Sequence, residues 1–389
     1  MKYKRYKICP VCENKISKKN IIQFDNFPIT EIILKKPIKK NINFKQLINY
    51  CNDCHHISLG YQYDQLNFYN ENYLNSSHSY SNRHSNEFFL NFVKSKLKKK
   101  TNTVMEIGAN DLFLLEKFKN YFQKAVAIDP CVRPSKKLKN IKCIKSFISD
   151  VKTKDINFTP DVILCSQTLE HIENPKKFIA DMVKFGNQNT QYFFQFPSCE
   201  SLIDRSSFDQ LHQQHLNIFS LNSVQKILFM NNFEIINYDF NENHYGSLMI
   251  YFKTTKKIRK IKIKKNKVSF TRKYENYKKF MQSNIDIVKK YKSRGYKIYA
   301  IGAGLMTPVL NYHLNGLLNL AENILDDDKR KINKFLPNIN SKIKSLSKTN
   351  IENAVVIITS TASSITVRKL LTILIKKNPK IIIIPALSY

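Results

Sequence analysis

The stretch TVMEIGANDLFLLEKF, residues 103–118, narrows the possible folds of this chain more than any other segment. Val104 and Met105 lie in a short apolar run, Gly108 follows it, and a helical pattern begins directly afterwards. A strand that leads through a glycine turn into a helix opens a doubly wound α/β sheet, where nucleotide-like ligands lie over the carboxyl ends of the strands. A glycine at that turn lets the backbone approach such a ligand closely.

Three later segments continue this pattern in order. In KAVAIDP, residues 124–130, a second expected strand ends in Asp129, and an acid at the end of a second strand commonly binds ribose hydroxyls. DVILCSQTLEHI at 161–172 and YFFQFP at 192–197 are further expected strands, and a helix is expected near 83–99. The ordered set predicts a ligand-binding α/β domain over residues 67–255.

The C-terminal part repeats the strand–turn–helix pattern. YKIYAIGAGLMTPVLNYHL carries Gly302 and Gly304 between an apolar strand and a helix, and AVVIITS and IIIIPALSY are expected parallel strands. We therefore expect a second Rossmann-like α/β domain at 292–389, joined by a basic helical linker at 256–291. The G-x-G turn leaves a second dinucleotide site open as an alternative.

The N-terminal part contains two C-x-x-C pairs, Cys9 with Cys12 and Cys51 with Cys54. Four thiolates from two separate pairs form the ligand set of a structural zinc ribbon, which leaves no open position for catalysis. The sequence thus predicts a zinc-binding domain over residues 1–66, with His55 or His56 as an alternative fourth ligand.

The formal net charge is +34, with lysines spread along the chain. Such a charge is compatible with nucleic acid, anionic lipid or phosphorylated substrates, and equally with a general bias toward Lys, Asn and Ile. The sequence has no run of about 18 apolar residues and its basic start lacks an apolar signal core. We therefore expect a cytoplasmic protein without a membrane partner.

Two motifs carry a family resemblance. MEIGANDLFLL resembles the first motif of class I S-adenosylmethionine methyltransferases, E-x-G-x-x-x-G, and DVILCSQTLEHIENP resembles their later motif that ends in L-E-H. The paired cysteines, FDQLHQQHLNIFSLNSV and HYGSLMIYF narrow the resemblance to sugar C-methyltransferases that act on nucleotide-linked keto-deoxysugars. It extends over nearly the whole chain. It implies a zinc-binding domain, a methyltransferase core and a C-terminal domain that closes over the sugar nucleotide without a redox cofactor.

The resemblance also assigns roles to residues. By the family's Y-H-E-H-L pattern, His215 takes the place of the essential histidine, whereas His212 replaces a tyrosine and Gln214 replaces a glutamate. Tyr73 matches the first of two family tyrosines. Other departures are Leu112 in place of the second glycine of the first motif, Asn75 in place of the second tyrosine, and a C-terminal glycine turn without the usual lysine.

The chemistry implied is carbon methylation through an enolate. His215 is expected to remove a proton next to a ketone, because a neutral histidine is available near neutral pH. His212, Gln214 and Tyr73 are the candidate donors to the enolate oxygen. The expected cofactor is S-adenosylmethionine, and its candidate binding residues are Glu106, Gly108, Asn110, Asp129 and Gln167. His171 is expected to shape the cofactor pocket, and His244 to line the sugar pocket.

Two other functions stay open at this point. A nucleic-acid methyltransferase fits the zinc ribbon and the charge, although SQTLEHI stands where an amino-methylating N/D-P-P-Y/F motif would follow the strand. A non-catalytic relative that only binds ligands fits the departures at Leu112 and Asn75. The leading prediction is a monomeric enzyme with a nucleotide-sugar substrate and no nucleic-acid partner.

Overall fold

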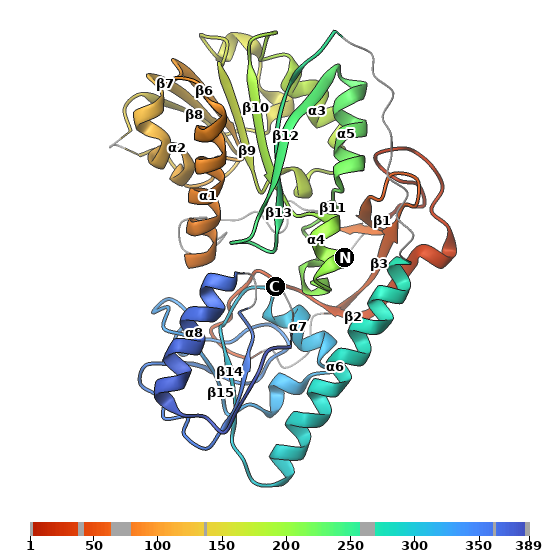
Figure 1. The fold of residues 1–389 in the computed structure, drawn as a ribbon, viewed down its shortest axis with the longest axis vertical. Coiled ribbons are helices and arrows are strands. Elements are labelled where there is room, and N and C mark those ends of the chain that lie inside the picture. Colours follow the sequence, from red (N-terminus) through yellow and green to blue (C-terminus); the bar gives the residue numbers. More distant parts are fainter. Residues whose placement is uncertain are drawn as a thin grey trace. The chain divides into compact units, whose positions relative to one another are not determined.

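We describe residues 3–37, 43–63, 79–135, 138–256, 269–360 and 363–385 of a computed structural model of the chain (Figure 1). The chain forms two compact units, and both contain separate stretches of sequence. The first unit comprises residues 1–17, 49–200 and 214–267, and the second comprises residues 18–48, 201–213 and 268–389. Strand β3 (Asn43–Tyr50) and helix α4 (Cys199–Asp204) each run from one unit into the other.

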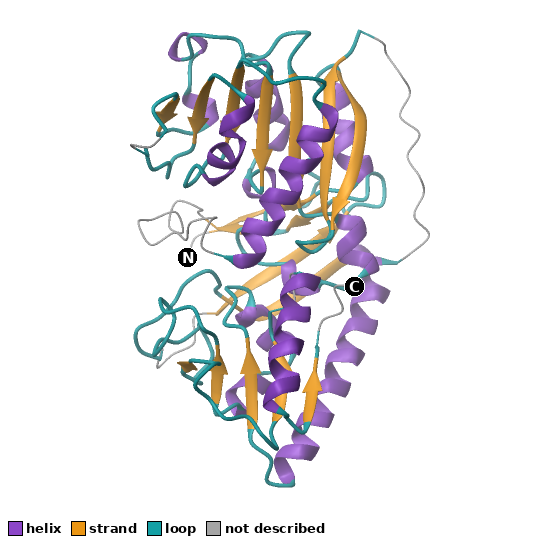
Figure 2. Cartoon of the chain, turned by 60° about the vertical axis from the view of Figure 1, so that its left-hand side comes forward, coloured by secondary structure: helices purple, strands orange, loops and turns teal. Residues whose placement is uncertain are grey.

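The first unit is a mixed α/β structure (Figure 2). Its strands are β1 (Tyr3–Arg5), β4 (Ile57–Leu59), β5 (Tyr61–Tyr63), β6 (Thr103–Ile107), β7 (Lys124–Ile128), β8 (Ile141–Ile144), β9 (Val162–Ser166), β10 (Gln191–Phe196), β11 (Asn217–Ile218), β12 (Phe233–Asn241) and β13 (Ser247–Thr254). Its helices are α1 (Tyr80–Lys96), α2 (Phe113–Phe118), α3 (Pro175–Val183) and α5 (Leu221–Met230).

The main sheet of this unit has seven strands in the order β12-β13-β10-β9-β6-β7-β8. The pairs from β10 to β8 are parallel, whereas β13 is antiparallel to β10 and to β12. The chain leaves β6 toward β7 and β8 and then returns to β9 on the other side of β6. The carboxyl ends of β6 and β9 therefore form a topological switch point, where open α/β sheets bind their ligands.

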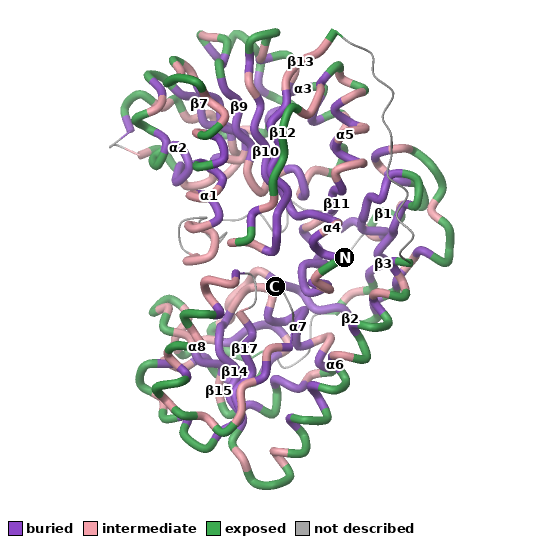
Figure 3. The backbone as a smooth tube through the Cα atoms, in the orientation of Figure 1, coloured by how far each residue is buried: buried purple, intermediate pink, exposed green. Residues whose placement is uncertain are grey.

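Helices cover both faces of this sheet. Successive apolar side chains of a strand point to opposite faces, so both faces have to be shielded from water. On β6, Val104 packs with residues of α1 and α2 such as Phe89 and Leu115. The next residue, Met105, packs on the opposite face with residues of α3 and α5 such as Phe178. Figure 3 shows that the central strands are buried along their length. The expected doubly wound arrangement is confirmed.

The second unit contains a smaller parallel sheet with strand order β16-β15-β14-β17-β18. The strands are β14 (Ile298–Ile301), β15 (Asn323–Leu325), β16 (Ile343–Lys344), β17 (Val355–Ile358) and β18 (Ile381–Ile383), and the unit also holds β2 (Ile21–Pro28) and most of β3. Its helices are α6 (Phe270–Ser293), α7 (Thr307–His313) and α8 (Ser364–Lys377). The second Rossmann-like sheet predicted from the glycine turn is present.

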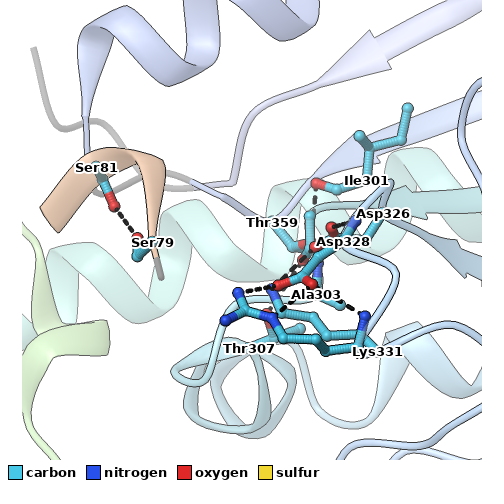
Figure 4. Close-up of polar contacts among 11 residues, drawn as sticks. Ser79, Ser81, Ile301, Ala303, Thr307, Asp326, Asp328, Lys331 and Thr359 are labelled. Carbon is cyan, nitrogen blue, oxygen red and sulfur yellow. Dashed lines mark hydrogen bonds and ion pairs between the residues drawn. The ribbon is translucent and has the colours of Figure 1, made fainter. Parts of the chain in front are cut away.

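The turn after β14 is held by backbone and side-chain hydrogen bonds, which Figure 4 shows. The Ala303 amide donates to Asp326 Oδ2 at 2.9 Å, and Thr359 Oγ1 donates to the Gly302 carbonyl at 2.6 Å. Lys331 Nζ lies 3.2 Å from Asp326 Oδ2. The acid at the end of the second strand here closes the glycine turn and pairs with a lysine. Figure 4 also draws Ser79, which caps α1 by accepting from the Asn82 amide.

Residues 18–48 group with the C-terminal sheet in the second compact unit. The domain boundaries predicted from the sequence are 1–66, 67–255, 256–291 and 292–389. They stay a prediction. Helix α6 lies in the predicted linker and extends two residues beyond it. None of the described helices is long and apolar enough to cross a membrane.

Candidate functional site

The four cysteines of the two C-x-x-C pairs lie together in the first unit. Their sulfur atoms are all within 4.8 Å of one another, with Cys9 and Cys54 at 3.5 Å and Cys12 and Cys51 at 3.4 Å. These separations exceed the S–S bond of about 2.0 Å by far. Tetrahedral Zn–S bonds of about 2.3 Å require sulfurs about 3.8 Å apart, so this arrangement is compatible with a zinc ribbon.

Two equivalent turns present the sulfurs. The Glu13 amide donates to the Cys9 carbonyl and the Cys9 amide to the Asn14 carbonyl; likewise the His55 amide donates to the Cys51 carbonyl and the Cys51 amide to the His56 carbonyl. The residue after each pair has a left-handed backbone, with φ of 64° at Glu13 and 58° at His55.

The alternative ligands are engaged elsewhere. His56 Nε2 lies 3.0 Å from Asn217 Oδ1, and His55 Nδ1 lies 3.3 Å from Asn222 Nδ2. Among the described residues, the candidate metal cluster of this region consists of the four cysteines alone. Thiolate ligation without histidine is therefore the reading that the geometry supports.

The ends of β6 and β9 touch at Gly108. This residue has a φ of 80°, and a Cβ built on it would lie 1.9 Å from Oγ1 of Thr168. The Gly108 amide donates to the Ile128 carbonyl at the end of β7. Glycine is thus needed here for backbone conformation and for close packing against Thr168, in addition to any approach of a ligand.

Asp129 holds the turn that follows β6. Its Oδ2 accepts from the Asn110 amide at 3.1 Å, and its Oδ1 accepts from the Cys131 amide. Burial raises the pKa of Asp129, while these two amide hydrogen bonds work in the opposite direction. The predicted residues Gly108, Asn110 and Asp129 therefore meet at the carboxyl edge of the sheet.

Glu106 is 3% exposed, and its Oε2 atom has no hydrogen-bond partner among the described residues. Burial, followed by the charges of Asp111 and Asp129, raises the pKa of Glu106 well above its ordinary value, while a hydrogen bond from the Leu115 amide lowers it. The Leu115 amide belongs to the first turn of α2. Glu106 thus acts as a capping group for α2, and a direct role toward a cofactor stays a prediction.

Leu112 has a left-handed backbone conformation. Its φ is 64° and it directly precedes α2, yet its side chain is 1% exposed. Leu112 therefore combines a left-handed turn with a side chain packed in the core.

Gln167 lies just beyond β9 with a φ of 51°. Its Nε2 donates to Ser247 Oγ at the start of β13, at 3.2 Å. His244 Nδ1 lies 3.3 Å from the same Ser247 Oγ, and burial lowers the pKa of His244 to about 4. Gln167 and His244 are thus brought together around one hydroxyl near the switch point.

The histidine-bearing stretch FDQLHQQHLNIFS divides between the units. His212 is 1% exposed and groups with the second unit, whereas Gln214 and His215 group with the first. The rings of His171 and His215 contact each other edge to face, with centroids 5.3 Å apart. His171 Nδ1 lies 2.9 Å from the Gln214 carbonyl, and burial lowers the pKa of His171 to about 4. Tyr73 lies outside the described residues.

Sequence reasoning missed a buried polar network beside this edge. Gln195 Nε2 donates to Ser85 Oγ and to Ser166 Oγ, and Asn241 Nδ2 donates to Gln195 Oε1 at 2.6 Å. Gln195 and Asn241 are both fully buried. The polar residue inside the apolar run YFFQFP was the available signal, since a buried amide requires partners.

Glu170 was also missed as a site residue. It is 0% exposed and sits in the 3₁₀ helix η7 (Leu169–His171) after β9. Glu170, His171 and His215 form the second group of potential metal ligands among the described residues. No sequence spacing predicts this cluster, because His215 is 44 residues from His171.

Comparison with known proteins adds a family assignment for one part of the chain. Residues 81–238 match the model of a methyltransferase domain family. No curated protein matches the chain. The N-methyltransferase NodS from Bradyrhizobium japonicum WM9 is one structural match, at 14% identity and a TM-score of 0.36 over 45% of this chain and 97% of that chain.

A second structural match is a 1,6-didemethyltoxoflavin-N1-methyltransferase from Burkholderia thailandensis, at 11% identity and a TM-score of 0.36, over 44% of this chain and 78% of that chain. Its structure contains S-adenosylhomocysteine. The sheet order, the switch point at Gly108 and the family match agree with one another. The chain carries a methyltransferase domain at residues 81–238, and this match supports S-adenosylmethionine-dependent methyltransferase activity.

Proposed function

We propose that the protein is an S-adenosylmethionine-dependent C-methyltransferase whose acceptor is a nucleotide-linked keto sugar. The observation that carries this proposal is the place of His215, which lies against His171 directly beyond β9, in the matched methyltransferase domain. A histidine at the ligand-binding edge of such a sheet suits the removal of a carbon-bound proton. The sugar as acceptor rests on the sequence resemblance.

The residues at the sheet edge fit the cofactor. Asp129 presents a carboxylate at the end of the second strand, Asn110 and Gly108 form the turn beside it, and Gln167 lies across the switch point. We assign Asp129 to the ribose hydroxyls and the 108–110 turn to the close approach of the backbone. When bound, S-adenosylmethionine supplies an electrophilic methyl group.

His215 acts as the general base. Its imidazole takes the proton from the sugar carbon next to the ketone, and the electron pair of that C–H bond moves into the enolate. The resulting enolate carbon is the nucleophile to which bound S-adenosylmethionine would supply its methyl group. A positioned base contributes roughly 10²–10⁴-fold to such a step.

Stabilisation of the enolate oxygen requires donors that are already in place. Gln214 precedes His215 and is 1% exposed. We assign its side-chain amide as one such donor. His212 and Tyr73 stay candidates from the resemblance alone.

The test is the variant His215→Ala. It should keep its fold and its affinity for S-adenosylhomocysteine, and its turnover should fall by about 10²-fold or more. It should also lose any exchange of the substrate's acidic C–H with deuterated solvent. His84→Ala, which changes a histidine on α1, is the matched control and should retain turnover. Near wild-type methylation by His215→Ala contradicts the assignment, and an unfolded variant indicates a packing role instead.

A further inference from the structure

Two segments far apart in sequence converge just beyond β9. The helix η7 carries Glu170 and His171, and the segment before β11 carries His215. One potential ligand atom from each of these three residues lies within 4.8 Å of the other two. The carboxylate oxygen Oε1 of Glu170 is 3.9 Å from Nε2 of His171.

Two further hydrogen bonds fix these two segments next to each other. His171 Nδ1 bonds to the carbonyl of Gln214, the residue directly before His215. Asn217 Nδ2 donates to the Ile172 carbonyl at 2.7 Å, which ties the same two segments a second time. The segment is further fixed where Asn217 and Ile218 pair with Ser58 and Ile57 of β4.

The hydrogen bond to Gln214 also determines which nitrogen of His171 is available. A carbonyl only accepts, so Nδ1 carries the proton and Nε2 keeps its lone pair, on the side of Glu170. Histidine ligands of metals characteristically donate their other ring N–H to a carbonyl or carboxylate in this way.

We propose that Glu170, His171 and His215 bind a divalent transition-metal ion of the zinc class. Two imidazole nitrogens and one carboxylate oxygen are a common ligand set for Zn²⁺ and for Fe²⁺. Bonds of about 2.1 Å place tetrahedral ligands about 3.4 Å apart, so the observed 3.9 Å needs only a small contraction. The Glu170 side chain that would supply the oxygen ligand is fully buried.

Filling this site has a consequence that rests on the proposed function. A metal ion on His215 occupies the lone pair that would take the substrate proton. The ion therefore inhibits methyl transfer, and the cluster makes the enzyme sensitive to free zinc.

The binding test uses full-length protein that retains one chelator-stable zinc at the cysteine cluster. Titration with ZnCl₂, followed by calorimetry and metal analysis, should show a second equivalent in the wild type. Glu170→Gln removes the charge but keeps the size, and it should weaken the second equivalent by 10-fold or more while the first is retained. Co²⁺ in the second site should give visible absorption without the thiolate-to-cobalt band of the cysteine cluster.

Glu173→Gln is the matched control, because Glu173 lies three residues further on and pairs with Lys4 at the surface. It should bind the second zinc like the wild type. The site is refuted by a wild type that binds one zinc only, by unchanged affinity in Glu170→Gln, or by equal losses in both variants. Circular dichroism and the retained first zinc show that each variant is folded.

The binding readout does not depend on methylation. If His215→Ala methylates normally while the wild type binds two zinc ions, the proposed function is contradicted and the metal site is supported. If zinc binds at the second site without lowering turnover, the inhibitory role is wrong.

Discussion

Gly108 and Thr168 bring the ends of β6 and β9 so close that no side chain fits between them. We predict that Gly108→Ala lowers the free energy of unfolding by about 2–4 kcal/mol, because the methyl group overlaps Thr168 and alanine disfavours a positive φ. Affinity for S-adenosylhomocysteine should fall as the turn shifts. Denaturant unfolding and calorimetry measure the two effects.

Gly304→Ala is the control for this prediction. A Cβ at Gly304 meets only Thr307 Oγ1, at an ordinary contact distance of 3.5 Å. Its effect on unfolding should stay within about 1 kcal/mol. Equal effects of the two substitutions would mean that contact with Thr168 is not the cause.

Leu112 gives a prediction with two opposing contributions. Leu112→Gly relieves a left-handed leucine, which is worth about 1–2 kcal/mol, but removes a side chain that is 1% exposed. Loss of a buried leucine side chain costs about 2–5 kcal/mol. The variant should therefore be less stable than the wild type in urea unfolding, although it restores the family residue. A stabilised variant would show that backbone strain dominates.

The carboxylate of Asp129 is predicted to determine cofactor affinity. Asp129→Ala should weaken S-adenosylhomocysteine binding by roughly 10–100-fold, since hydrogen bonds to a charged group are worth about 1.5–3 kcal/mol. Calorimetric titration measures the change.

Asp161→Ala separates affinity from stability. Asp161 accepts from the Thr103 and Asn102 amides at the opposite, amino end of β6. Loss of the Asp161 carboxylate should lower the free energy of unfolding without changing the affinity for S-adenosylhomocysteine. Unchanged binding by Asp129→Ala would remove Asp129 from the cofactor site.

The order of strands, turns and acids could be predicted from the sequence, because each element is defined by local residues. A strand and its end are predicted within a few positions in two segments, Val104 to Gly108 and Ala125 to Asp129. The sheet then brings Gly108, Asn110 and Asp129 together, as parallel strands must.

The cluster at Glu170 could not be predicted in this way. Its third member, His215, reaches Glu170 through hydrogen bonds of Gln214 and Asn217 with residues more than 40 positions away. Such tertiary contacts leave no local periodicity. The positive φ of Leu112 could not be predicted from the sequence either. Leucine rarely adopts a positive φ, and here the surrounding structure imposes this conformation.

Removal of the cysteine ligands should destabilise the N-terminal segment. Cys51→Ser should lack the chelator-stable zinc and should unfold at a lower temperature, because metal binding is coupled to the folding of such sites. Cys143→Ser changes a thiol on β8, outside the cluster, and should keep both the zinc and the thermal midpoint. Absence of zinc from the wild type would contradict the metal assignment.

The stability of the second unit should depend on pH through His313. Burial among Phe24, Tyr274, Tyr277 and Tyr312 lowers the pKa of His313 to about 3 from an ordinary 6.5. Below pH 6.5 the unfolded chain binds a proton that the folded chain excludes, so stability falls as the pH decreases. The slope approaches about 1.4 kcal/mol per pH unit, which amounts to roughly 2 kcal/mol between pH 7 and pH 5.

His313→Gln removes the titrating group. The free energy of unfolding of this variant should therefore decrease between pH 7 and pH 5 by roughly 2 kcal/mol less than that of the wild type. This difference does not depend on the stability of the variant at pH 7. Urea unfolding of both proteins at the two pH values measures the difference, with tyrosine fluorescence reporting on the ring cluster around His313. Because the comparison is between slopes, a general destabilisation by glutamine does not affect it. Identical slopes for the two proteins would show that His313 is protonated as readily in the folded state as in the unfolded chain.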